Sequence, residues 1–149
     1  MLRPLALALA LTAVPASAQV SFSPTVGYDQ RGNAPTIGLA FDVAAPVYGL
    51  PVQPSVRPLV EYVFGPNDLD VVHANLDLIA RVRASPYATA APYVKGGLAL
   101  TYVAEEGFED ETDVAFSLGA GLEVSRLFAE GEYAFGDYDG ARLRLGVRF

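Results

Sequence analysis

The sequence predicts an all-β protein, an eight-stranded antiparallel up-and-down barrel that spans a membrane. Apolar and polar residues alternate with period two in eight successive stretches, which is the pattern of β-strands with two unlike faces. The stretches are long enough to cross a membrane, because a tilted strand needs about 9–11 residues to span a bilayer. One face of each stretch is bulky and aromatic, whereas the other combines small residues with charges.

The first three predicted strands cover residues 20–28, 36–44 and 55–64. Each carries an apolar side chain at alternate positions, and most positions between are small or polar. The apolar set is Val20, Phe22, Pro24, Val26, Tyr28, Ile37, Leu39, Phe41, Val43, Val56, Val60, Tyr62 and Phe64. The stretch "DQRGNAP" predicts the first turn, and a proline-rich connection precedes the third strand.

The next two predicted strands cover 71–83 and 92–104. Their apolar face comprises Val72, Ala74, Leu76, Leu78, Ala80, Val82, Val94, Leu98, Leu100 and Tyr102. Their other face comprises His73, Asn75, Asp77, Ile79, Arg81, Arg83, Tyr93, Lys95, Gly97, Ala99 and Thr101. The connection "GPND" precedes them and "ASPYATA" separates them, both rich in turn-forming residues.

The last three predicted strands cover 113–124, 127–136 and 141–149. Their apolar face comprises Val114, Phe116, Leu118, Ala120, Leu122, Val124, Leu127, Ala129, Gly131, Tyr133, Phe135, Ala141, Leu143, Leu145, Val147 and Phe149. The stretch "DYDG" predicts a three-residue loop that ends on a left-handed Gly140. In that register Ala141 pairs with Asp137, and Glu130 lies opposite Arg148. Glu132 lies opposite Gly146, diagonal to both Arg144 and Arg148.

The polar faces indicate a membrane barrel, because a soluble barrel points its bulky apolar face inward. Glycine and alanine at the inner positions suit the narrow interior of an eight-stranded barrel, which side chains just fill. The charges on this face are nearly balanced, as buried charges require. They are Arg57, Arg81, Arg83, Lys95, Arg142, Arg144, Arg148, Asp42, Glu61, Asp77, Glu123, Glu130 and Glu132. We predict that a lumenal network plugs the barrel, formed by Glu130, Glu132, Arg142, Arg144, Arg148, Glu123, Arg57, Glu61, Asp77 and Arg81.

The N-terminus predicts secretion. "MLRPLALALALTAVPASA" has a charged start, an apolar stretch and an A-x-A cleavage site, so residues 1–18 read as a signal peptide and 19–149 as one barrel domain. The chain has no cysteine, which excludes disulfides and thiolate metal sites. Its formal net charge of −7 makes nucleic acid a poor partner. The acidic excess lies mostly in connections on one side, which we expect to be extracellular.

The alternating strands, the signal peptide and the terminal "LRLGVRF" resemble the small OmpA/OmpX-type outer-membrane β-barrel family of Gram-negative bacteria. Aromatic residues near the strand ends, including Tyr87, fit the girdles of such barrels. The resemblance implies that the protein is a monomer and that its partners include outer-membrane lipid and lipopolysaccharide. It also implies that the barrel-assembly machinery recognises the alternate apolar residues of the terminal stretch. These residues are Ala141, Leu143, Leu145, Val147 and Phe149.

No catalytic, cofactor or metal site is predicted. The deacylases of the resembling barrels carry a His-x-Ser pair, but here "HAN" places Asn75 after His73, so His73 is expected in a lumenal hydrogen-bonded network. The acidic run from Glu105 to Asp113 lacks the ligand spacing of a calcium loop, and a solvated loop open to an extracellular partner is expected. The predicted function is structural or surface-interactional. A lipid-modifying enzyme and a narrow porin-like channel remain the alternatives, and a lipocalin-like carrier is disfavoured by the charged interior.

Overall fold

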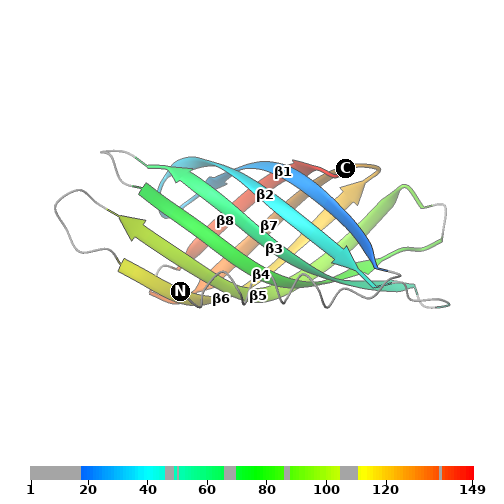
Figure 1. The fold of residues 1–149 in the computed structure, drawn as a ribbon. Coiled ribbons are helices and arrows are strands. Elements are labelled where there is room, and N and C mark those ends of the chain that lie inside the picture. Colours follow the sequence, from blue (N-terminus) through cyan, green and yellow to red (C-terminus); the bar gives the residue numbers. More distant parts are fainter. Residues whose placement is uncertain are drawn as a thin grey trace.

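The protein is a closed barrel of eight antiparallel strands (Figure 1). The computed structural model describes residues 18–45, 49, 51–65, 70–85, 88–104, 111–137 and 139–149. The strands are β1 (Gln19–Asp29), β2 (Ala34–Ala44), β3 (Val52–Phe64), β4 (Asp70–Val82), β5 (Ala90–Ala104), β6 (Glu111–Val124), β7 (Leu127–Phe135) and β8 (Gly140–Val147). Each strand pairs with its sequence neighbours, and β1 pairs with β8 to close the barrel. The predicted fold class is confirmed.

The up-and-down topology gives the barrel two distinct ends. The terminus end carries the start of β1, the end of β8 and the β2–β3, β4–β5 and β6–β7 connections. The loop end carries the other four connections and lies on the left of Figure 1. No helix in the described part of the chain is long and apolar enough to cross a membrane. The predicted signal peptide falls outside the described residues, except for Ala18, as do Tyr87 and the acidic residues 105–110.

All strands except β7 begin one to three residues before their predicted starts, whereas β4, β7 and β8 end one or two residues earlier than predicted. β3 begins at Val52 because its pairing with β4 continues to Val52↔Val82. The β2–β3 ladder is interrupted between Ala40↔Leu59 and Val43↔Val56, and Pro58, which has no N–H to donate, lies in this gap. β1 runs to Asp29, which the sequence placed in a turn, and β6 begins at Glu111.

The predicted β7–β8 register is wrong. Ala134 pairs with Gly140, so Glu130 lies opposite Arg144 rather than Arg148, and Glu132 lies opposite Arg142 rather than Gly146. The connection is longer than a three-residue loop, and Gly140 belongs to β8 without a positive φ.

Two contacts hold the longer β7–β8 connection. An added Cβ at Gly136 would lie 2.9 Å from the Ala115 Cβ, so the chain approaches β6 closely here. The Arg31 guanidinium donates to the Asp137 carbonyl and, at 3.2 Å, to the Asp139 carboxylate. The displacement from the predicted register is an even number of residues, so every side chain keeps its predicted face.

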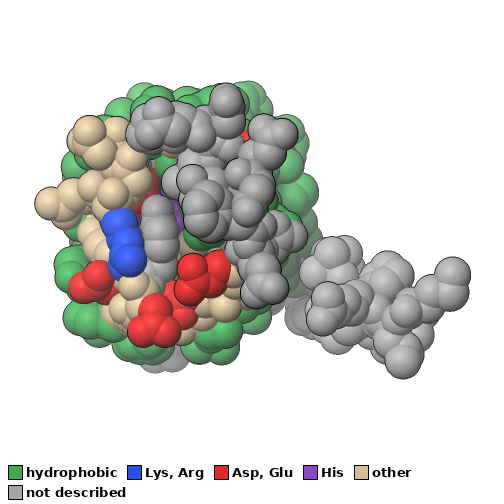
Figure 2. Space-filling model, turned by 90° about the vertical axis from the view of Figure 1, so that its left-hand side faces the viewer, with side chains coloured by type: hydrophobic (Ala, Val, Ile, Leu, Met, Phe, Trp, Pro, Cys, Tyr) green, Lys and Arg blue, Asp and Glu red, His purple; other side chains and the backbone are tan. Residues whose placement is uncertain are grey.

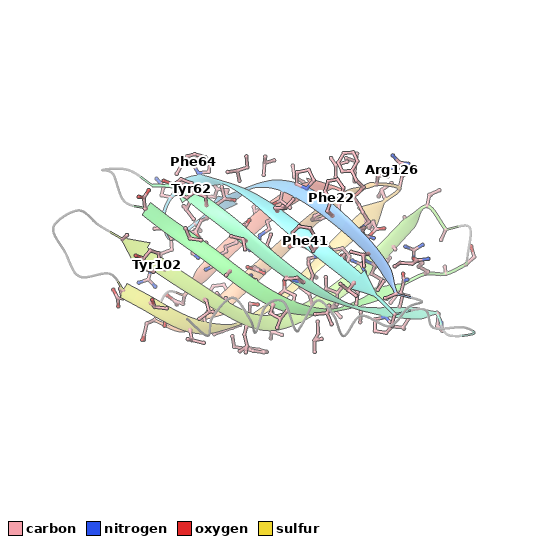
Figure 3. All side chains as sticks on the ribbon, in the orientation of Figure 1. Phe22, Phe41, Tyr62, Phe64, Tyr102 and Arg126 are labelled. Carbon is pink, nitrogen blue, oxygen red and sulfur yellow. The ribbon has the colours of Figure 1, made fainter. Side chains whose placement is uncertain are left out.

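The inner face is lined by charged, polar and small residues, and the outer face is apolar. Buried positions alternate with exposed ones along nearly the whole of each strand. Figure 3 shows side chains projecting outward around the barrel, with Tyr62, Phe64 and Tyr102 near the loop end and Phe22 and Arg126 towards the terminus end. The apolar side chains therefore form a belt around the molecule, which is the reverse of a soluble barrel.

Two aromatic rings occupy the lumen over glycines. Tyr93 lies against Gly121, where an added Cβ would be 2.3 Å from the ring, and Phe128 lies equally close to Gly146. The Arg57 guanidinium carbon is 5.6 Å from the Tyr93 ring centroid and 4.9 Å from that of Phe128. The glycines thus make room for rings that contact a buried cation.

Candidate functional site: the lumenal charge network

The charged side chains of all eight strands meet inside the barrel. At the terminus end, Asp42 on β2 accepts from Arg57 on β3 at 2.9 Å, from Arg148 after β8 at 3.1 Å, and from Arg81 on β4. Glu123 on β6 contacts Arg148 at 2.7 Å and Arg81 at 3.2 Å. Arg57, Arg81, Asp42 and Glu123 are all buried, so these ion pairs form away from bulk water.

Glu123 also contacts the half-exposed Arg83 at 3.6 Å, at the mouth of the lumen. This mouth is a cavity of about 350 Å³ lined partly by Asp42, Arg81, Arg83, Glu123 and Arg148. The polar lining indicates that water can enter the mouth.

The middle of the lumen is built around two carboxylates of β7. Glu130 contacts Arg57 at 2.7 Å, Lys95 at 2.8 Å and Arg144 at 3.1 Å. Glu132 contacts Lys95 and Arg144, each at 2.6 Å. Lys95 also binds Asp77 at 2.9 Å. Since Arg57 joins Glu130 to Asp42, the middle and terminus-end groups form one connected network.

The loop end of the network contains the only histidine in the chain. Asp29 Oδ2 lies 2.9 Å from His73 Nε2 and 3.2 Å from Arg142 Nε. Arg142 connects this group to Glu132 at 3.4 Å, and Glu61 joins through Arg144 at 2.6 Å. The ion pairs therefore run without interruption from the mouth at the terminus end to the loop end.

His73 lies between a carboxylate and a hydroxyl. Its Nδ1 is 2.9 Å from Thr101 Oγ1, and its Nε2 faces Asp29. A nucleophile, a histidine and an acid in this order can perform acyl transfer. However, each of the three residues is only 1% exposed, and Arg142 also occupies the carboxylate, so no substrate reaches the hydroxyl. The arrangement fits a structural histidine in a hydrogen-bonded network.

Two further polar side chains that could take part in catalysis lie elsewhere in the network. Asn75 donates to Glu132 at 3.0 Å, and Ser117 donates to Asp77 at 3.4 Å. Among the described residues, no group of three or more His, Cys, Asp or Glu side chains is placed to hold a metal ion.

The structure brings all ten predicted network residues together, with one change of partner. Arg148 contacts Asp42 and Glu123 instead of Glu130 and Glu132, because of the different β7–β8 register.

Sequence reasoning missed Asp29, which continues the inward alternation of β1 by one step. It also missed Lys95 as a hub with three carboxylate partners, although Lys95 was expected to face inward. Thr101 is paired directly with His73 between β4 and β5, so knowledge of the β4–β5 register would have identified Thr101 as the partner of His73.

The C-terminal residues close the barrel. Leu143, Leu145 and Phe149 are exposed on the outer face, and Val147 is half-buried there. Phe149 exchanges two backbone hydrogen bonds with Phe22, at 2.9 and 3.3 Å, which continue the β1–β8 register past the end of β8. The two rings stack with centroids 5.3 Å apart. The final residue thus completes the seam between the first and last strands.

The comparison with solved structures decides the fold. No protein-family model and no curated protein matches the sequence. The N-terminal β-barrel domain of Pseudomonas aeruginosa OprF matches with a TM-score of 0.63 at 17% identity, covering 89% of this chain and 100% of that one. This chain has the fold of the small outer-membrane barrels.

Two further solved structures share this fold. Neisserial surface protein A matches with a TM-score of 0.54 at 14% identity, over 88% of this chain and 94% of that one. The Yersinia pestis outer membrane protein Ail, solved in a phospholipid bilayer nanodisc, matches with a TM-score of 0.53 at 14% identity, over 89% of this chain and 100% of that one. At these identities the likeness extends to the fold.

Proposed function

We propose that the chain is an integral outer-membrane protein of a Gram-negative bacterium, with a plugged lumen and a structural or surface-interaction role. It would be exported by the signal peptide 1–18 and inserted by the barrel-assembly machinery. The observation that carries this proposal is the inverted polarity of the barrel. Interlocked, buried ion pairs line its inside, and apolar side chains such as Leu76, Leu98 and Leu145 are more than half exposed on its outside. A surrounding apolar phase such as a lipid bilayer makes that exposure favourable.

The ion pairs support the plugged lumen. Eight strands enclose a space that side chains just fill. Here that space contains the large side chains of Arg57, Arg81 and Arg144, which are no more than 2% exposed and each bind at least two carboxylates. An ion crossing the lumen would have to displace these charge-assisted bonds. We therefore propose that the barrel does not conduct.

The loop end supports a role at the cell surface. Figure 2, which views the molecule from this end, shows acidic side chains on the lower part of the rim. Asp70, Glu111, Asp137 and Asp139 are exposed there. The sequence between β5 and β6 adds further acids. With the termini in the periplasm, this acidic end faces outward and is available to an extracellular partner.

Membrane fractionation of cells producing the full chain tests the proposal. The protein is expected in the outer-membrane fraction with a heat-sensitive shift in gel mobility. Phe149→Asp is expected to deplete it strongly from that fraction, because it breaks the apolar seam with Phe22. Phe149→Tyr keeps the aromatic ring and serves as the control. A soluble periplasmic wild type, or normal membrane levels of Phe149→Asp, would contradict the proposal.

A further inference from the structure

An apolar groove runs along the outer face of β7 and β8. Ala120, Ala129 and Gly131 form a shallow floor at which little side chain projects, and Leu143 and Leu145 of β8 border it. One cavity of about 600 Å³ and another of about 580 Å³ share Ala129, Leu145 and Val26 in their linings, so they are parts of one groove. Their sizes fall in the roughly 300–1,000 Å³ range of sites that hold small molecules. We call this feature the β7 groove.

The terminus end of the β7 groove lies next to the turn that carries Arg126. Its lining includes Val124 and Leu127, the two residues that flank the Ser125–Arg126 turn. Arg126 is exposed, and in the described part of the chain its guanidinium has no carboxylate partner. By contrast, Arg31, Arg83 and Arg148 each contact a carboxylate. The groove therefore ends next to the turn that carries an exposed guanidinium, at the terminus end of the barrel.

We propose that the β7 groove holds one phospholipid, with an acyl chain along Ala129 and Leu145 and the phosphate on Arg126. This inference rests on the proposed membrane location, with the terminus end towards the periplasm. In that orientation Arg126 lies at the periplasmic leaflet, which consists of phospholipids, and is remote from the loop end. A guanidinium binds phosphate by paired charge-assisted hydrogen bonds. An acyl chain fills an apolar channel that no side chain of the barrel fills.

Native mass spectrometry of the mature chain tests this site. The protein is folded into vesicles of phosphatidylglycerol and phosphatidylethanolamine, extracted in detergent and stripped at increasing collision energy. The wild type is expected to retain one phospholipid after the remaining lipids have left. Ala129→Leu fills the groove and Arg126→Gln removes the phosphate ligand, and each is expected to lower retention about tenfold or more. Ala80→Leu on the outer face of β4 and Arg31→Gln at the loop end are the matched controls, and both should retain the lipid.

Three results would overturn the proposal. The first is a wild type that inserts but keeps no lipid, and the second is retention unchanged in either Ala129→Leu or Arg126→Gln. The third is a two-chain mass that Ala129→Leu abolishes, which would assign the groove to a second copy of the chain. Folding in the vesicles is followed separately by the gel-mobility shift. A protein that does not insert refutes the proposed membrane location, whereas an inserted protein without bound lipid refutes the phospholipid site alone.

Discussion

Adjacent residues of β8 point to opposite faces of the barrel wall and meet opposite environments. Arg144 is 2% exposed and contacts Glu61, Glu130 and Glu132. Leu145, the next residue, is 59% exposed. Inside, stability depends on directional contacts between particular atoms. Outside, at the proposed membrane location, stability would depend on the apolar character of the surface and much less on its shape, because lipid adapts to that shape.

The difference predicts which substitutions each face tolerates. Removing one partner of a buried ion pair leaves an uncompensated charge in a space that excludes water. At the proposed membrane location, adding a charge outside would place it in hydrocarbon. Changing the shape of an apolar side chain should matter inside and hardly at all outside.

The largest expected effect comes from breaking the inner network at Glu130. Glu130→Gln leaves Arg57, Lys95 and Arg144 with one carboxylate fewer, and we expect the free energy of unfolding to fall by about 3–5 kcal/mol. Arg144→Gln should cost a similar amount. The double variant should cost less than the sum, because Glu130 and Arg144 face each other across β7 and β8. Urea titration in lipid vesicles measures all three, and additive or negligible losses would show that the network is not coupled.

The next effect tests the outer face. Leu98 pairs with Leu76 near the middle of β4 and β5, and both side chains are more than half exposed. Leu98→Arg is expected to cost about 2–4 kcal/mol in the same titration, the value for arginine at the bilayer midplane. Leu98→Phe keeps the position apolar and should fold like the wild type. If Leu98→Arg is as stable as Leu98→Phe, residue 98 does not face lipid.

The smallest effect separates shape from polarity at two neighbouring residues. Ile79 is 2% exposed in the lumen, and Leu78 is 68% exposed outside. Ile79→Leu is expected to cost about 1 kcal/mol because the surrounding side chains are close-packed. Leu78→Ile should change stability by less than about 0.5 kcal/mol. Equal losses of stability in Ile79→Leu and Leu78→Ile would contradict the proposal that the lumen is packed more closely than the outer face.

The sequence predicts the faces of the strands better than their register. Period-two alternation depends only on which environment each residue meets, and it assigned Arg144 and Leu145 to the correct faces. Register depends on connection length, and "DYDG" alone gives no sign that Gly136 packs on Ala115 or that Arg31 binds the β7–β8 connection. Such contacts come from distant parts of the chain, so local turn preferences missed them.

The contrast between strand faces and strand register also explains which features of the charge network the sequence predicts. Near-balance of the inner charges predicted that they would meet, and they do. The individual partners of Arg148 were predicted wrongly because they follow from register. Asp29 was assigned to a turn because β1 was ended one residue early. The pairing of His73 with Asp29 spans the barrel from β4 to β1, which no local pattern encodes.

Single-channel recording tests the central claim most directly, namely that the ion pairs fill the lumen. The purified, folded protein is inserted into planar bilayers under an applied voltage. A continuous network from Arg148 to Asp29 predicts no steady current for the wild type. Reproducible open channels from folded wild-type protein would contradict the plugged lumen, even if every strand and every face were assigned correctly.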